Sequence, residues 1–266
     1  MSEGMTEKLS ILEDVLRRHA PLLVAYSGGV DSTCLLAVAH RTLGARVTGV
    51  IADSPSLPRQ ALAEALEVAR GFGARVEVIA TEEFSNPDYL INPPNRCYFC
   101  KAELFSRMDA LARERGLAAI AYGENADDPA HLRPGSQAAE EFAVIAPLRQ
   151  AGLTKADVRE LSRRLGLPTA DAPAQPCLSS RIPHGTPVTR EALNLVERGE
   201  AFMRSLGFRV FRVRYQAGSP AGALVQVAPA ENALLQARQE RLMAGLRAVG
   251  FGSVTIDPDG YRGISA

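Results

Sequence analysis

A short glycine-rich turn near the start of the chain constrains the fold more than any other stretch. It reads Ala25-Tyr26-Ser27-Gly28-Gly29-Val30-Asp31-Ser32; an apolar run at 22–24 precedes it, and apolar residues at helical spacing follow at 33–39. This pattern predicts a buried strand that ends in the turn and passes directly into a helix. Unpaired backbone N–H groups in such a turn lie at the positive end of the helix dipole, and both features suit a phosphate group.

The residues of the turn add groups that bind a nucleotide. Gly28 and Gly29 let the backbone approach a phosphate closely, because glycine has no side chain and tolerates positive φ. Ser27 and Ser32 supply hydroxyl donors, and Asp31 can bind Mg²⁺ or orient a ligand. The turn is neither a Walker loop nor the dinucleotide fingerprint. It resembles the SGGxDS signature of the PP-loop ATP pyrophosphatases, which split ATP into AMP and pyrophosphate to activate a substrate as an adenylate.

The overall composition excludes several kinds of partner. The 266 residues carry 30 Lys and Arg against 30 Asp and Glu, so no global electric field recruits nucleic acid or a membrane surface. The N-terminal residues lack the pattern of a signal peptide, and no apolar run approaches the length of a membrane span. With four cysteines and no secretion signal, we expect a cytoplasmic protein whose thiols bind metal or take part in chemistry.

Strands and helices are predicted to alternate through residues 1–170. The predicted strands lie at 22–24, 46–52, 75–80, 118–121 and 144–146, and the predicted helices at 7–19, 33–39, 58–72, 101–115 and 154–165. This alternation predicts an α/β fold, a parallel sheet with helices on both faces. Ligands of such sheets bind beyond the carboxyl ends of the strands, where Ser27 and Gly123 are both expected.

A second domain is predicted from residue 171 to the end. The stretch 167–188 holds five prolines and no periodicity, which indicates a long loop. Beyond it we expect a small α+β domain for substrate binding and oligomerisation, with helices at 190–206 and 231–249 and strands at 208–215, 223–228 and 253–256.

Three of the four cysteines lie in motifs that indicate chemistry. Cys97 and Cys100 form a Cys-x-x-Cys pair, and Cys177 lies in the proline-rich loop. Cys34 falls on an apolar helix and is predicted to be a core residue. The other three thiols have three possible uses: a [4Fe–4S] cluster with one iron open, structural zinc with His184 as fourth ligand, or a helix-start pair beside a lone reactive Cys177.

Four motifs now identify a resemblance. SGGVDS, NRCYFCK, GENADD and PCLSSR occur here in the order typical of the LarE family, ATP-dependent sulfur transferases that build the nickel-pincer nucleotide cofactor of lactate racemase. The resemblance implies a pyridinium dicarboxylate mononucleotide as the substrate. It implies that ATP adenylates each carboxylate, which is then converted to a thiocarboxylate.

Family members supply the sulfur in two ways. One kind sacrifices the sulfur of a single cysteine at the position of Cys177 and keeps dehydroalanine there. The other kind has cysteines at the positions of Cys97, Cys100 and Cys177 and resembles cluster-dependent tRNA thiolases. This chain has all three cysteines, so the resemblance favours the [4Fe–4S] form.

The second domain contains a candidate phosphate clamp. Alternation along 208–215 places Arg212 and Arg214 on one strand face, where two guanidinium groups can hold one phosphate or simply face solvent. The resemblance assigns both arginines to the phosphate of the substrate. Glu200 and Glu231 resemble acidic positions that bind a metal near that site, although Glu231 also suits a helix start.

Further residues are assigned to ATP by the resemblance. The stretch from Gly123 to Asp127 and its neighbour Asp128 contacts the nucleotide in the family, although the residues alone also suit a plain turn capping a helix. Lys101 and Arg181 match basic positions that neutralise the leaving pyrophosphate.

The sequence thus predicts an adenylating sulfur transferase that uses ATP, Mg²⁺ and a [4Fe–4S] cluster on a small-molecule pyridinium mononucleotide. Family members tend to form homo-oligomers, so we expect one here. Two other functions stay open. A PP-loop tRNA thiolase or amide-forming synthetase shares the fold, but the balanced charge speaks against tRNA. The second alternative is not an enzyme but an ATP-sensing module whose cysteines hold structural zinc.

Overall fold

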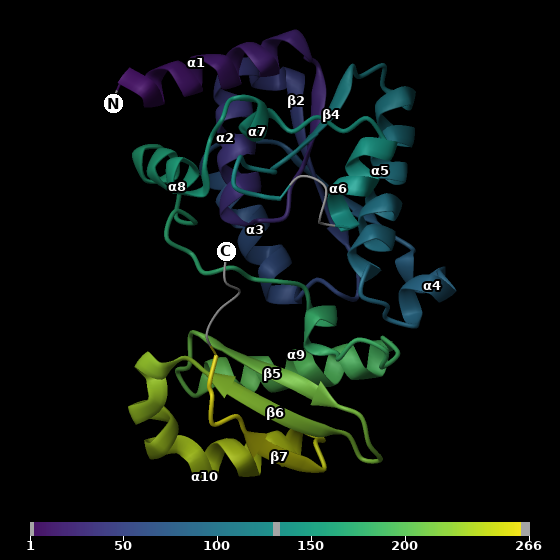
Figure 1. Cartoon of the computed structure of the whole chain (residues 1–266), viewed down its shortest axis with the longest axis vertical. Helices are drawn as coiled ribbons and strands as arrows, with labels where there is room; N and C mark the ends of the chain where they lie inside the picture. The colour runs from purple at the N-terminus through teal and green to yellow at the C-terminus, as the bar shows by residue number, and fades with distance from the viewer. Residues whose placement is uncertain (1–2, 130–133, 262–266) are drawn as a thin grey trace. The chain divides into compact units, whose positions relative to one another are not determined.

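The structure, a computed structural model, describes residues 3–129 and 134–261 (Figure 1). The chain divides into two compact units. The N-terminal unit comprises Met1–Ser54, Arg59–Asn86 and Asn95–Ala172, and the C-terminal unit comprises Pro55–Pro58, Pro87–Pro94 and Pro173–Ala266. Two short excursions of the N-terminal half, 55–58 and 87–94, therefore group with the C-terminal unit.

A parallel sheet forms the centre of the N-terminal unit. Its strands in the described residues are β1 (Leu22–Ala25), β2 (Val47–Asp53), β3 (Val76–Ala80) and β4 (Ala119–Tyr122), in the order β3-β2-β1-β4. Leu22, Leu23 and Val24 of β1 are buried, as expected for a central strand covered on both faces. The predicted α/β class is confirmed.

Helices flank both sides of this sheet (Figure 1). They are α1 (Glu3–Arg18), α2 (Val30–Leu43), α3 (Arg59–Gly71), α5 (Arg96–Glu114), α6 (Pro134–Glu141), α7 (Pro147–Gln150) and α8 (Lys155–Arg164). Phe105 and Met108 of α5 pack with Leu23 and Ile120 of the sheet, together with alanines of α6. Helix α2 packs between α1 and α8. No helix of the described residues is long and apolar enough to cross a membrane.

The strand predicted at 144–146 is wrong in extent. Only one parallel bridge forms there, between Ala121 and Ile145. Pro147 begins α7 immediately afterwards. Because proline has no N–H to donate to a ladder and favours a first helical turn, the chain leaves the sheet after this single bridge.

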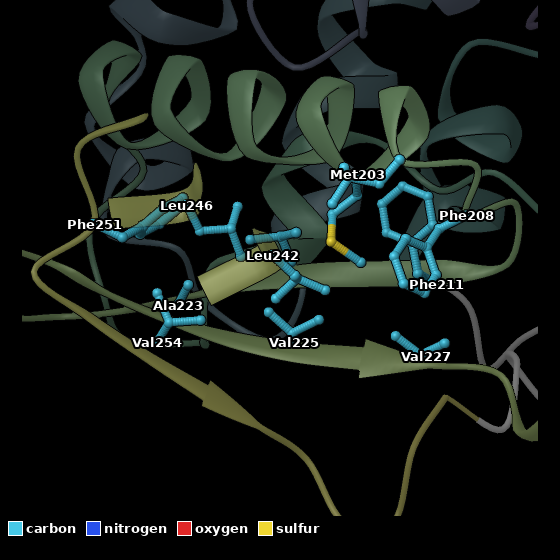
Figure 2. Close-up of a cluster of buried hydrophobic side chains, with 12 residues drawn as sticks. Met203, Phe208, Phe211, Ala223, Val225, Val227, Leu242, Leu246, Phe251 and Val254 are labelled. Atoms are coloured by element: carbon cyan, nitrogen blue, oxygen red, sulfur yellow. The ribbon is translucent and has the colours of Figure 1, made fainter. Parts of the chain in front are cut away.

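The C-terminal unit combines a mixed sheet with helices. Its strands in the described residues are β5 (Phe211–Gln216), β6 (Gly222–Val227) and β7 (Ser253–Ile256), and its helices are α4 (Pro87–Leu90), α9 (Arg190–Ser205) and α10 (Asn232–Val249). Strand β6 pairs antiparallel with β5 and parallel with β7. Figure 2 shows Met203 of α9 and Leu242 of α10 meeting Phe211 and Val225 from the strands in one apolar core.

Candidate functional site

The glycine-rich turn is shaped by its contact with α3. Gly28 has φ +75°, and a Cβ at this position would lie 2.7 Å from the Cβ of Ala65. The hydroxyl of Tyr26 donates to the carbonyl oxygen of Ala65 at 2.8 Å and ties the turn to the same helix. Glycine is therefore required twice here, by its backbone angle and by the close approach of α3.

Two serines close the turn from inside. The backbone N–H of Ser27 donates to Ser32 Oγ at 3.1 Å, and the two hydroxyl oxygens lie 3.0 Å apart. Gly29 is the N-cap of α2, and no side chain of the described residues caps that helix. The first-turn N–H groups of α2 thus lie at an uncapped helix start, which is the arrangement that binds phosphate.

The end of β4 touches the start of α2. A Cβ at Gly123 would lie 2.8 Å from the backbone nitrogen of Ser32 and 3.0 Å from the carbonyl carbon of Asp31. The stretch that begins at Gly123 is thereby held against the glycine-rich turn. Both lie at the carboxyl edge of the parallel sheet, where ligands of such sheets bind.

The side chain of Asp31 contacts residues from two other segments at this edge of the sheet. Its Oδ1 accepts a hydrogen bond from Asn125 Nδ2 at 3.3 Å, and its Oδ2 lies 2.5 Å from Lys155 Nζ. Asp127 accepts from the backbone N–H of Lys155 at 2.7 Å and donates its own N–H to Asn125 Oδ1 at 2.9 Å. Four side chains from three segments thus form one polar network around Asp31.

Sequence reasoning missed Lys155 in this network, whereas Asn125 lies within the stretch from Gly123 to Asp128 that was predicted to contact the nucleotide. One signal for Lys155 was present, because it lies at the start of the helix predicted at 154–165. A cation there opposes the helix dipole and is favourable only beside an anion.

A second polar cluster surrounds Glu124, which is buried. Tyr122 donates its hydroxyl hydrogen to Glu124 Oε2, Ser136 Oγ donates to Oε1 at 2.7 Å, and Arg149 Nε lies 3.3 Å from Oε2. Burial and the hydrogen bond to Glu124 raise the pKa of Tyr122 above its ordinary value. These four residues line a cavity of about 440 Å³ between β4, α6 and α7. Sequence reasoning assigned none of these four residues individually.

Lys101 adjoins this second cluster. Its Nζ lies 4.8 Å from the centre of the Tyr122 ring, a cation–π distance. A Cβ at Gly135 would lie 2.6 Å from Lys101 Cδ, so the glycine leaves room for the lysine stem. Its predicted contact with pyrophosphate stays a prediction.

The cysteines of the N-terminal unit lie in two environments. Cys97 and Cys100 occupy the first turns of α5, where Cys97 is exposed and Cys100 partly buried. Cys34 has 0% exposure inside α2, as predicted for a core residue. Burial raises the pKa of the Cys34 thiol to about 12.

Cys177 of the C-terminal unit immediately precedes a short 3₁₀ turn, Leu178–Arg181. Its carbonyl oxygen accepts hydrogen bonds from Ser180 N at 3.0 Å, Ser180 Oγ at 2.7 Å and Arg181 Nη1 at 2.9 Å. The Cys177 side chain stays partly exposed while its backbone is fixed.

Arg181 is engaged on all sides. Its Nε and Nη2 lie 2.8 and 3.1 Å from the two carboxylate oxygens of Glu200, and the two residues are 4% and 3% exposed. These contacts give Arg181 a positioning role for the Cys177 loop. The predicted action of Arg181 on pyrophosphate stays a prediction.

A triangle of hydroxyl groups anchors the same loop. Ser56, Tyr89 and Ser179 place their hydroxyl oxygens 2.5, 2.7 and 2.8 Å apart in a buried cluster. Leu178 N donates to the carbonyl oxygen of Ser56 at 2.8 Å. The two excursions, 55–58 and 87–94, therefore support the Cys177 loop, a role that sequence reasoning did not assign to them.

Arg212 and Arg214 lie on β5, with side chains opposite to the buried Phe211 and Val213. Arg212 Nη2 donates to Ala174 O at 2.9 Å, and Arg214 Nη1 donates to Ser180 O at 3.2 Å. The strand thereby presents both guanidinium groups to the loop that carries Cys177.

The guanidinium groups of Arg181 and Arg214 both act on Arg212. Burial first, and then the charges of Arg181 and Arg214, lower the pKa of Arg212 below its ordinary value, while Glu200 raises it. Glu200 is the carboxylate paired with Arg181. Such clustering of like charges favours an anionic ligand, which would relieve the repulsion.

The two glutamates predicted to bind metal have other partners in this structure. Glu231 accepts from the backbone N–H groups of Arg209 at 2.8 Å and Val210 at 3.0 Å, and Glu200 is paired with Arg181. Within 3–129 and 134–261, no group of three or more His, Cys, Asp or Glu side chains is arranged to hold a metal ion. Metal binding by Glu200 and Glu231 stays a prediction.

Known proteins are similar to this chain, some of them over nearly its whole length. An uncharacterized protein of Synechocystis sp. is 41% identical over 262 residues, 97% of this chain and 96% of the relative. Pyridinium-3,5-bisthiocarboxylic acid mononucleotide synthase of Lactiplantibacillus plantarum is 32% identical over 259 residues, 97% of this chain and 93% of that protein. A glutamine-hydrolyzing GMP synthase of Thermomicrobium roseum is 28% identical over 211 residues, 69% of this chain and 39% of that protein. No family model matches the chain.

Proposed function

The chain belongs to the LarE family of sulfur transferases, and from that premise we propose that it thiolates the carboxylates of pyridinium-3,5-dicarboxylate mononucleotide at the expense of ATP. The observation that carries the proposal is the uncapped turn at 25–32, whose shape depends on Gly28 and on the contact of Gly123 with α2. The full-length relationship to a pyridinium bisthiocarboxylate synthase supports the choice of substrate.

ATP in this proposal binds at the carboxyl edge of the parallel sheet. The N–H groups of Gly28, Gly29 and the first turn of α2 face the phosphates, with Ser27 and Ser32 as hydroxyl donors. Asp31 is proposed to hold Mg²⁺, because hard cations prefer carboxylate oxygens. Asp127, which already orders the backbone of Lys155, lies at the same edge and fits the nucleotide contact expected of it.

The proposed reaction has two steps. A substrate carboxylate oxygen bonds to the α-phosphorus of ATP while the bond to the bridging oxygen breaks, and pyrophosphate leaves with the electron pair and charge stabilised by Lys101. A sulfur nucleophile then bonds to the acyl carbon while the acyl C–O bond breaks, and AMP leaves with that electron pair. Adenylation is needed because a free carboxylate oxygen is a poor leaving group.

The substrate phosphate is proposed to bind between Arg212 and Arg214. The pKa of Arg212 supports the assignment: burial lowers it first, the charges of Arg181 and Arg214 lower it further, and a bound anion would offset these effects. Arg181 holds the neighbouring Cys177 loop through its main-chain contacts.

The sulfur is proposed to come from a [4Fe–4S] cluster bound by Cys97, Cys100 and Cys177. These three thiols are exposed or partly exposed whereas Cys34 is sealed in the core, which fits a ligand set that an assembling cluster can reach. The Cys97–Cys100 spacing on one helical turn suits two irons of one cluster. When bound, the cluster would supply sulfide at its iron that lacks a protein ligand.

Anaerobic reconstitution with iron and sulfide tests the proposal. Protein with about four irons per chain, incubated with ATP, Mg²⁺ and the dicarboxylate mononucleotide, is expected to release AMP and pyrophosphate and to form thiocarboxylate. Cys97→Ser, Cys100→Ser and Cys177→Ser should each abolish iron loading, and Cys34→Ser should not. Loss of H₂S from Cys177 without iron would instead show sacrificial transfer. Absence of AMP release with any carboxylate substrate would overturn adenylation.

Self-assembly is a separate proposal. The expected homo-oligomer is tested by the molar mass in solution from light scattering; a monomer at working concentration would contradict it.

A further inference from the structure

Lys155 makes an ion pair that has a cost of its own. It is the first residue of α8, where the positive end of the helix dipole disfavours a cation. Thr154 and Asp157 already satisfy the helix start through a capping box, so the lysine contributes nothing to the cap. The cost is offset by Asp31, whose Oδ2 lies 2.5 Å from Lys155 Nζ.

The carboxylate that pairs with Lys155 belongs to the glycine-rich turn. Asp31 is the second residue of α2 and follows the two glycines that shape the turn. The backbone of Lys155 is fixed by Asp127, while its Nζ sits at the end of a flexible stem. The side chains of Lys155 and Asp31 are 33% and 22% exposed, so a ligand arriving at the turn reaches both.

A magnesium ion and the lysine compete for the same carboxylate. Mg²⁺ carries twice the charge of an ammonium group and binds carboxylate oxygens directly, usually in company with the phosphates of a nucleotide. If Asp31 binds the ion, Lys155 loses the carboxylate with which it is paired and is left beside a polyphosphate chain. The favourable destination for its charge is then a phosphate oxygen.

We propose that Lys155 is a phosphate ligand of ATP that Asp31 holds in reserve while the site is empty. When ATP arrives with Mg²⁺, Asp31 transfers from the ammonium group to the metal ion, and Lys155 transfers to the β- or γ-phosphate. The inference rests on the proposed function only in its ATP-binding part. It adds a substrate contact from α8, far along the chain from the glycine-rich turn.

This exchange predicts two effects of opposite sign when Lys155 is removed. Without its competitor, Asp31 binds Mg²⁺ more readily, so the free Mg²⁺ concentration for half-maximal ATP binding falls. Without the ammonium group, ATP at saturating Mg²⁺ loses a charge-assisted hydrogen bond, and its dissociation constant rises about tenfold. If the ion pair were purely structural, its loss would weaken both Mg²⁺ binding and ATP binding, or neither of them.

The chain offers a closely matched control. Lys8 Nζ of α1 lies 2.6 Å from Oδ2 of Asp157, which is on α8 like Lys155. The side chains of Lys8 and Asp157 are 33% and 22% exposed, as are those of Lys155 and Asp31. Lys8→Gln therefore removes an ion pair of equal geometry whose acid lies at the helix cap rather than in the turn. It should leave both the ATP dissociation constant and the Mg²⁺ requirement unchanged.

The experiment measures ATP binding by titration calorimetry at saturating and at varied Mg²⁺ for wild type, K155Q, K155R and K8Q. The opposed shifts in K155Q, with most ATP affinity restored in K155R, support the inference. Unchanged ATP affinity in K155Q, or an equal loss in K155Q and K8Q, overturns it. Wild type that fails to bind ATP overturns the proposed function as well, whereas ATP binding with the opposed shifts but no sulfur transfer leaves the inference standing alone.

A measurement on wild-type protein covers the case in which K155Q does not fold. Acetylation by an activated ester, followed by mass spectrometry, reports the accessibility of each lysine. Saturating ATP and Mg²⁺ should slow acetylation of Lys155 several-fold and leave Lys8 unchanged. Equal labelling of Lys155 with and without ATP and Mg²⁺ would overturn the inference.

Discussion

The guanidinium group of Arg181 donates a hydrogen bond of 2.9 Å to the carbonyl oxygen of Cys177. Nε and Nη2 of the same guanidinium group donate to the carboxylate of Glu200, a residue that is only 3% exposed. The backbone of the candidate sulfur-carrying residue is therefore held by a buried ion pair within its own unit. A thiol that must meet a separate substrate needs such support, because small displacements of a reacting group are costly.

Breaking this ion pair should destabilise the protein. Glu200→Gln leaves the Arg181 guanidinium buried without its charge partner, and we expect the free energy of unfolding to fall by about 3 kcal/mol. Urea denaturation measures the change. Glu160→Gln removes an exposed pair with Arg164 on α8 and should leave the midpoint unchanged. Equal midpoints for wild type and Glu200→Gln would show that the ion pair contributes nothing to the stability of the protein.

Gly28→Ala should abolish ATP binding. The new methyl group would lie 2.7 Å from Ala65 Cβ, and alanine is strained at φ +75°. The glycine-rich turn must then move away from α3, which displaces the N–H groups proposed to bind phosphate. Calorimetric titration with ATP and Mg²⁺ is the measurement.

Gly71→Ala is the matched control for that substitution. Gly71 ends α3 with open space around its Cβ position, so alanine should be neutral or slightly stabilising. Wild-type ATP affinity in Gly28→Ala would contradict the proposed phosphate site.

Local patterns were sufficient to predict the sheet and the turn. The apolar run at 22–24, the glycines and the helical spacing after Ser32 act within a few residues, so periodicity reveals them. The strand predicted at 144–146 is too long for the same reason, since the structure has only a single bridge there. Pattern shows that the segment is apolar, but not that Pro147 removes the chain from the sheet.

Contacts between distant segments could not be predicted in this way. Lys155 meets Asp31 across 124 positions, and Ser179 meets Ser56 across 123. Neither pair has a periodic signature, and the excursions 55–58 and 87–94 are too short to carry one. Such contacts follow from the folded backbone, so sequence reasoning found the residue types of the site and missed the partners that orient them.

Alkylation should separate Cys34 from the exposed thiols. At pH 9, with a pKa of about 12, about one Cys34 thiol in a thousand is ionised, and burial also excludes the reagent. Iodoacetamide should therefore modify Cys97 and Cys177 in metal-free protein and spare Cys34, as read by peptide mass spectrometry. In urea, all four cysteines should react. Rapid labelling of Cys34 in the folded protein would contradict its core position.

Arg214→Gln should weaken binding of the mononucleotide through its phosphate. Arg214 lies beside Arg212 on β5, and its Nε is held by Gln226 Oε1 at 2.6 Å, which orients the guanidinium group. Loss of one charge-assisted hydrogen bond should raise KM about tenfold. We expect kcat to change little, because the phosphate is not the reacting group and its binding is equal in ground and transition states.

The analogue without the phosphate makes this prediction specific. Wild type should bind the pyridinium dicarboxylate nucleoside about as weakly as Arg214→Gln binds the mononucleotide, and the substitution should add little further loss for the nucleoside. Arg209→Gln, which removes an exposed charge just before β5, should keep the wild-type KM. A fall in kcat at constant KM in Arg214→Gln would place Arg214 at the reacting carboxylate rather than at the phosphate, because only an interaction made in the transition state behaves in that way.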